Sequence, residues 1–226
     1  TANNLGEVPY FELKDHSRHK GVEGITQWEN HQQVKTGGIS LSSYDFQLPT
    51  KNLTATTLDP KVNSLSSFQK YTYEGNYSER AAGDHYTKML MEQENATQEQ
   101  KAFSGNMRIL TAGANFTLTE HMRDDQNANY YVTQFSCVMR SDELMVNVNK
   151  EKSFMYEFSA CAIPAKCSFR PEISVRKPVM QGPQTATVVG KTKEEIWTDK
   201  YGRIKVHFHW DKQSKSDELS SCWMRV

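Results

Sequence analysis

Apolar and polar residues alternate without a break from Ile204 to Trp210, and this pattern limits the possible folds more than any other stretch of the chain. Side chains two residues apart lie on the same face of a β-strand. One face would be apolar and buried, and it would carry Ile204, Val206, Phe208 and Trp210. The opposite face would be exposed to water, and it would carry Lys205, His207, His209 and Asp211. The alternation therefore predicts a strand with one buried face.

The segments on both sides of this strand also carry strand and turn signals. The stretch 185–189 is rich in β-branched residues and lies between Pro183 and Gly190. Gly202 suits a turn, because glycine adopts positive φ at no steric cost. After a charged loop at 211–218, strand character resumes at 220–226. Short strands at such even spacing favour a small barrel or a sandwich.

One upstream stretch, from about 78 to 94, has helical periodicity instead. Its apolar residues form one stripe, which consists of Ala82, Tyr86, Met89 and Leu90. Asn76 or Ser78 would cap the helix N-terminus, and Glu79 in the first turn would interact favourably with the helix dipole. Met89 and Met91 are expected to pack in the core.

The remaining upstream region is typical of short strands separated by polar connectors. Strands are expected at 39–43, 71–75, 114–119, 130–139 and 154–162, and a short strand is also possible at 144–146 within the segment 141–152. In the strand at 154–162, the residues expected on one face are Phe154, Tyr156, Phe158, Ala160 and Ala162. The connectors with little core signal are 1–37, 50–67 and 95–101. The first contains His16, His19 and His31, whose spacing does not bring them together. Asp45 is expected to cap a turn or to lie at a sheet edge.

Several of these stretches resemble one known family. They are 182–190 (GPQTATVVG), 194–211 (EEIWTDKYGRIKVHFHWD) and 220–226 (SSCWMRV), with shorter matches at 44–46 (Tyr-Asp-Phe) and 71–77 (Tyr-x-Tyr-x-Gly-x-Tyr). These residues resemble the VgrG (valine–glycine repeat protein G) proteins, the trimeric spikes of the type VI secretion system, which are related to contractile-phage tail spikes. The match is specific because it is long, ordered and includes Trp197, Trp210 and Trp223. It covers about residues 38–226.

The resemblance implies a mainly β fold with one prominent helix. Residues 1–168 would be a partial body of the phage-tail-hub type, 169–182 a linker, and 183–226 the first strands of a barrel of the OB (oligonucleotide/oligosaccharide-binding) type. The prolines at 171 and 178 are typical of an extended connector, which is why the boundary is placed there. The chain begins at Thr1 without an initiator Met or a signal peptide, so we expect it to be an internal piece of a longer protein.

The resemblance also implies a structural role in export, with no enzymatic activity and no cofactor. Three copies would form the tip of the tail tube and puncture the target envelope. The implied partners are the other copies, the tail-tube ring protein, a sharpening tip protein and effectors, with no nucleic acid and with membrane contact only on puncture. Assembly would occur in the bacterial cytoplasm, before export through the type VI apparatus.

Composition independently narrows the function classes. Lys plus Arg and Asp plus Glu are both 27, so the formal net charge is zero, which argues against a dedicated nucleic-acid-binding protein. No apolar run reaches the length of about 18 residues that a membrane-spanning helix needs. The four cysteines, at positions 137, 161, 167 and 222, include no Cys-x-x-Cys pair, so reduced thiols are expected rather than a zinc site.

Two other functions stay open on the sequence. His207, His209 and Asp211 share a strand face at a spacing of about 7 Å, which could hold a metal ion for a hydrolase, although a hydrated outer face or a subunit contact explains them as well. An OB-type barrel could instead bind a sugar or single-stranded nucleic acid through Tyr201, Arg203, Lys205 and His207. No P-loop and no Gly-x-Ser-x-Gly nucleophile elbow is present.

Overall fold

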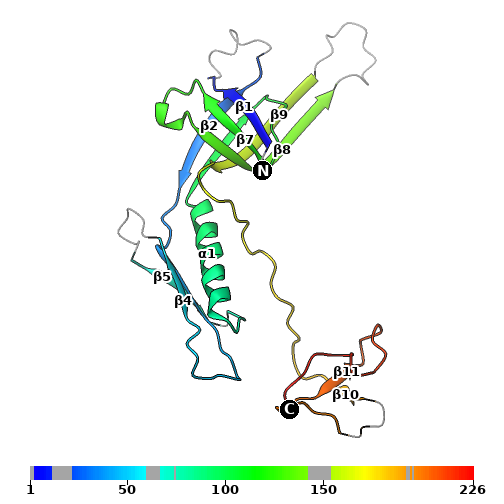
Figure 1. The fold of residues 1–226 in the computed structure, drawn as a ribbon. Coiled ribbons are helices and arrows are strands. Elements are labelled where there is room, and N and C mark those ends of the chain that lie inside the picture. The colour runs from blue at the N-terminus through cyan, green and yellow to red at the C-terminus, as the bar shows by residue number, and fades with distance from the viewer. Residues whose placement is uncertain are drawn as a thin grey trace. The chain divides into compact units, whose positions relative to one another are not determined.

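The computed structural model describes residues 3–11, 22–59, 67–73, 75–141, 154–191, 194 and 196–226. The chain separates into two compact units, Thr1–Glu172 and Ile173–Val226, and each is described by itself. Among the described residues the fold is mainly β with one α-helix, as expected (Figure 1). No helix in these residues has the length and apolar character needed to cross a membrane.

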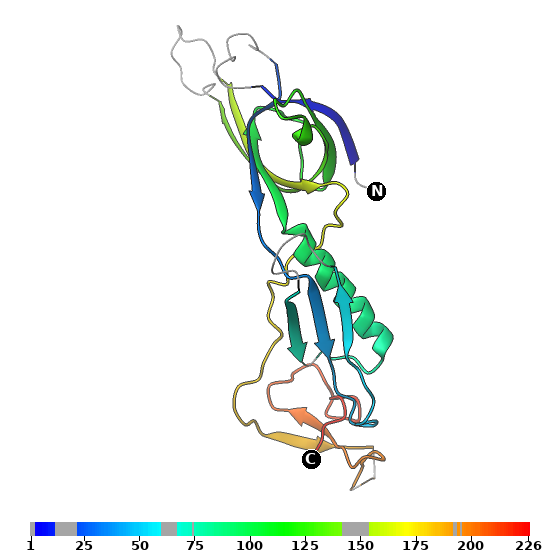
Figure 2. The same ribbon diagram turned by 90° about the vertical axis from the view of Figure 1, so that its left-hand side faces the viewer.

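The larger sheet of the first unit has six strands in the order β1-β7-β8-β9-β6-β2. Their bounds are β1 Asn3–Pro9, β2 Ile25–Gln32, β6 Glu99–Gly105, β7 Ala114–Thr119, β8 Asn129–Ser141 and β9 Phe154–Pro164. β1 runs parallel to β7, and the other neighbouring pairs are antiparallel. The sheet is curled, so that its two outer strands approach each other (Figure 2). A single bridge between Tyr10 and Ile25 joins them.

The inside of this curled sheet holds the main apolar core. Buried and partly exposed residues alternate along β7, and in β9 the side chains of Phe158, Ala160 and Ala162 are buried while Glu157 and Ser159 are exposed. The predicted faces of β9 are therefore confirmed for these residues. The buried core cluster consists of Val8, Ile25, Phe103, Leu110, Phe116, Leu118, Tyr130, Val132, Phe158, Ala160 and Ala162.

The prediction of an irregular connector at 1–37 is wrong, because β1 and β2 are strands of the larger sheet. Val8 and Ile25 are fully buried in its core. Few side chains of these strands are buried, and their composition is therefore polar. Their backbones nevertheless complete the sheet. His31 lies exposed on β2, with its Nε2 3.3 Å from Glu29, whereas His16 and His19 lie outside the described residues.

A second, smaller sheet has three strands in the order β4-β3-β5. They are β3 Gly38–Ser42, β4 Ala55–Leu58 and β5 Gln69–Tyr73, with β3 antiparallel to β4 and parallel to β5. The helix α1, Arg80–Ala96, packs against β3 and β4, and Thr57 Oγ1 donates a hydrogen bond to Thr87 Oγ1 across this contact at 2.9 Å. Leu41, Leu53 and Tyr77 form the core between these layers.

The predicted helix exists, but its cap and its buried face differ from the prediction. Glu79 is the N-cap residue and makes no side-chain capping hydrogen bond, so neither Asn76 nor Ser78 caps the helix. The residues buried on α1 are Gly83, Thr87, Met91 and Ala96, whereas Tyr86 is exposed. Small residues face the interior because the buried Tyr77 ring lies directly against Gly83. Met91 packs in the core, as expected.

Two further stretches predicted to be polar connectors are structured. The segment 50–67 contains β4, and Leu53 and Ala55 are fully buried; residues 60–66 lie outside the described residues. The segment 95–101 contains the last two residues of α1 and the start of β6, where Lys101 is buried. Composition misled the prediction at Lys101, because a buried lysine with hydrogen-bond partners gives no apolar signal. The strand suggested at 144–146 also lies outside the described residues.

In the second unit, β10 (Ala186–Val189) pairs antiparallel with β11 (Lys205–Phe208). The strand predicted to reach Trp210 ends at Phe208, because the chain turns there and the backbone N–H of Asp211 donates to the carbonyl of Phe208 at 3.0 Å. The stretch 220–226 contributes only a bridge between Ile204 and Met224. The strands described here do not form a closed barrel, so the OB-type barrel is not confirmed.

Candidate functional site

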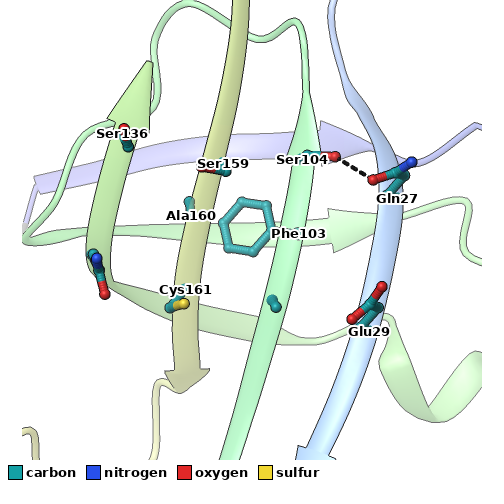
Figure 3. A pocket seen from close by; sticks show the side chains of 10 residues that line it. Gln27, Glu29, Phe103, Ser104, Ser136, Ser159, Ala160 and Cys161 are labelled. Atoms are coloured by element: carbon teal, nitrogen blue, oxygen red, sulfur yellow. Dashed lines mark hydrogen bonds between the residues drawn. The ribbon is translucent and has the colours of Figure 1, made fainter. Parts of the chain in front are cut away.

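A shallow groove of about 250 Å³ runs over the outer face of the larger sheet, across β2, β6, β9 and β8 (Figure 3). Its lining residues are Gln27, Glu29, Ala102, Phe103, Ser104, Gln134, Ser136, Ser159, Ala160 and Cys161. The strand register places them in two cross-strand rows. One row is Gln27, Ser104, Ser159 and Ser136, and the other is Glu29, Ala102, Cys161 and Gln134. Small side chains on the two central strands make the floor.

The groove is lined mainly by small and neutral polar side chains. Ser104 Oγ donates a hydrogen bond to Gln27 Oε1 at 2.9 Å, which ties β6 to β2 at the rim (Figure 3). The lining contains Cys161 but no histidine, so the thiol has no imidazole base within the groove. Sequence patterns alone do not indicate this surface. The alternation in 154–162 did place Ser159 outward, but only the register aligns it with Ser104 and Ser136.

A larger cavity of about 770 Å³ lies at one end of the smaller sheet, between the loops at 43–51 and 73–79. The two shorter motifs of the family resemblance, at 44–46 and 71–77, meet around it although they are far apart in the sequence. Asp45 Oδ1 accepts a hydrogen bond from the backbone N–H of Gln47 at 2.9 Å, which confirms its predicted role in capping a turn. The buried Tyr77 hydroxyl lies 2.6 Å from the carbonyl oxygen of Leu53, and burial raises its pKa, so it remains a donor.

The structure does not bring the candidate metal ligands together. His207 lies on β11, His209 follows the end of the strand, and Asp211 Oδ1 accepts the backbone N–H groups of Gln213 and Ser214 at 2.9 and 3.2 Å. Within the described part of the chain, no group of three His, Cys, Asp or Glu side chains is arranged to hold a metal ion.

The basic and aromatic residues considered for a binding groove make contacts within the second unit instead. Arg203 Nη2 lies 2.6 Å from Asp199 Oδ2. Lys205 Nζ donates to the carbonyl oxygen of Glu218 at 2.6 Å, and it lies over the rings of Trp197 and Trp223 at 5.6 and 5.3 Å. These cations therefore hold loops of the unit together.

Asp199 organises the turn before β11, and its pKa provides a test of that role. Burial acts to raise the pKa of Asp199, but hydrogen bonds from the Arg203 side chain and from the backbone N–H groups of Arg203 and Tyr201 outweigh this effect and hold it below the usual value. A lowered folded-state pKa stabilises the turn at neutral pH, and this stabilisation is lost as pH falls through that pKa.

We therefore expect the Tyr201 and Arg203 amide resonances of the folded protein to move together below about pH 4 in an NMR titration. In Asp199→Asn, which keeps one acceptor oxygen but cannot titrate, the same resonances should stay constant over this range. Equal movement in both proteins would show that another group controls the turn.

Comparison with known proteins places the chain in a family. The family model described as phage tail baseplate hub (GPD) matches residues 1–143, which is more than half of the chain. The chain belongs to the phage tail baseplate hub family. This baseplate hub chain is 37% identical to the type VI secretion system spike protein VgrG1c of Pseudomonas aeruginosa, over 97% of its own length and 30% of the relative's. It is 36% identical to VgrG1a of the same organism, over 97% of this chain and 34% of that protein. The resemblance to VgrG proteins is thus confirmed.

The match covers only part of each relative, and a solved structure shares the fold. The baseplate hub chain spans only about a third of the length of these curated relatives. The actin cross-linking toxin VgrG1 of Vibrio cholerae is 27% identical over 91% of this chain and 18% of that protein. A solved component of the Escherichia coli type VI secretion system, described as similar to the T4 tail proteins gp27 and gp5, superimposes with a TM-score of 0.51, covering 96% of this chain and 42% of that one. At 13% identity, this last likeness supports the fold alone.

Proposed function

We propose that this chain is part of a structural spike of the type VI secretion system, in which three copies form the tip of the tail tube. The observation that carries the proposal is the 37% identity to a spike protein over 97% of the chain. In this proposal residues 1–168 belong to the hub body, 169–182 connect, and 183–226 begin an OB-type barrel that is completed by other strands.

The proposed mechanism is mechanical. Contraction of the tail sheath supplies the work, and the spike must stay rigid and match the ring of the tail tube. Closed threefold symmetry would let strand edges and open sheet faces meet their counterparts on neighbouring copies. The tube ring protein, a tip protein and effectors are the proposed partners, and the assembled spike leaves the bacterial cytoplasm through the apparatus itself.

In this proposal the chain carries out no chemical step of its own. Its relatives named as spike proteins are about three times longer, and the Vibrio cholerae relative named as an actin cross-linking toxin is matched over only 18% of its length. An effector activity would therefore belong to segments outside the region that matches.

The oligomeric state tests the proposal. Light scattering on the full-length protein should give the mass of three chains at all concentrations examined, and the protein should reach the culture medium only when the secretion apparatus is intact. A salt-sensitive monomer that binds oligonucleotides or oligosaccharides would favour the OB-module hypothesis. A monomer with stoichiometric metal and an activity lost on His207→Ala would favour the hydrolase hypothesis. Either result would overturn the spike proposal.

A further inference from the structure

A lysine ammonium is buried inside the larger sheet, which is unusual for this side chain. Lys101 lies on β6 with 1% of its side chain exposed. Its Nζ donates hydrogen bonds to Asn30 Oδ1 on β2 at 2.9 Å, to Glu99 Oε1 on β6 at 2.7 Å, and to Gln126 Oε1 at 3.0 Å. The ammonium therefore has three oxygen acceptors, and it also lies 5.9 Å from the centre of the Tyr130 ring.

The third acceptor comes from a loop rather than from a strand. Gln126 ends the short 3₁₀ helix η2 (Asp124–Gln126), in the loop that joins β7 to β8, and is 5% exposed. Its Oε1 also accepts the indole N–H of Trp28 at 3.1 Å, and its Nε2 donates to Asp125 Oδ2 at 2.7 Å. The Tyr130 hydroxyl donates to the main-chain oxygen of Gln126 at 2.8 Å, and burial raises the pKa of Tyr130 to about 12, which keeps this donor protonated.

The rest of this loop is compact but lies near the surface. Asn127 and His121 close it with two hydrogen bonds, from the His121 N–H to Asn127 Oδ1 at 2.9 Å and from Asn127 Nδ2 to the His121 carbonyl at 3.0 Å. Met122 at its tip is 73% exposed. The ladder between β7 and β8 ends at the pair Thr117 and Asn129, so the loop lies beyond the regular strand pairing. It could therefore lift without breaking that ladder.

Lifting the loop would remove Gln126 from both Lys101 and Trp28. A buried ammonium that loses an acceptor is strongly destabilised unless water replaces it. Closure of the loop and burial of Lys101 are therefore coupled through the Gln126 side chain.

We propose that Lys101 acts as an internal latch, which holds the loop 121–127 closed over one end of the larger sheet and whose release opens that end locally while the strand ladders stay intact. The latch joins three separate parts of the chain through one ammonium group. Its opening would expose the edges of Trp28 and Tyr130 to water. The proposal concerns the folding unit alone and does not rest on the spike function.

Hydrogen exchange of the full chain, followed by mass spectrometry, tests the latch with the substitution Lys101→Met, which keeps the length of the side chain and removes its charge. We expect the amides of 121–127 to exchange at least about 10-fold faster, and those of β8 and β9 to change less than about twofold. Lys51→Met is the matched control, because Lys51 Nζ also makes an ion pair, with Glu79 at 3.1 Å, but on the surface. It should leave the exchange of 121–127 unchanged.

A second variant, Gln126→Leu, removes the latch from the loop side and decides the question alone if Lys101→Met fails to fold. It should accelerate the exchange of the same amides. Amides at 121–127 that remain as protected as in the wild type would overturn the proposal. So would equally faster exchange across all six strands, because Lys101 would then contribute only to global stability.

Discussion

Replacing Phe116 with alanine is expected to destabilise the first unit by about 3–5 kcal/mol. The side chain is 0% exposed, and its ring centre lies 5.4 Å from that of Phe103 and 5.8 Å from that of Tyr130. Truncation would remove apolar contacts and leave a cavity, because rings held by other strands of the sheet cannot close the space fully. Urea unfolding of the full chain, followed by far-UV circular dichroism, would measure the loss.

The matched control is Phe68→Ala, which makes the same chemical change at a side chain that is 64% exposed. That substitution should change the free energy of unfolding by about 0.5 kcal/mol or less. If the two variants were destabilised equally, the assignment of Phe116 to the core of the curled sheet would be wrong.

Gly83→Ala should also destabilise the first unit, by about 2 kcal/mol, although alanine is intrinsically the better helix former by about 1 kcal/mol. A Cβ at this position would lie 2.6 Å from two atoms of the Tyr77 ring and 2.8 Å from its hydroxyl. The ring cannot easily move, because its hydroxyl is within hydrogen-bond distance of the carbonyls of Leu41 and Leu53. Relieving the clash would cost those buried contacts. Urea unfolding, followed by the helical circular dichroism signal, would report the effect.

A double-mutant cycle with Tyr77→Leu separates the clash from helix propensity. Once the ring is gone, Gly83→Ala should be neutral or stabilising by up to about 1 kcal/mol. A higher unfolding midpoint for Gly83→Ala in the wild-type background would contradict the predicted contact between α1 and Tyr77.

The strands that sequence patterns located well are those with a dense apolar side. The strand predicted at 154–162 corresponds to β9 and has the predicted faces, since Phe158, Ala160 and Ala162 recur at every second position. β1, β2 and β4 were missed because most of their side chains are polar or exposed. Such strands are stabilised by backbone hydrogen bonds to neighbouring strands. These bonds do not depend on the pattern of apolar and polar side chains, so that pattern does not predict the strands.

The polar interior was missed for a related reason. Lysine and glutamine are normally expected at the surface, so the sequence predicts that Lys101 and Gln126 are exposed. Their burial is favourable only because residues from distant positions in the chain supply hydrogen-bond partners. Similarly, the stripe expected on α1 included Tyr86, whereas the helix approaches its sheet through Gly83 and Thr87. Periodicity locates an apolar stripe, but the side chain that a neighbour presents decides which residues face inward.

The sequence by itself determined the β-rich class, the single helix of the described region and the kinship with VgrG proteins, because alternation, turn residues and long ordered motifs are local properties. Only the tertiary structure decided the strand order, the rows of the outer groove and the partners of Lys101. These depend on register between segments far apart in the chain, and a shift of one residue would turn every side chain to the other face.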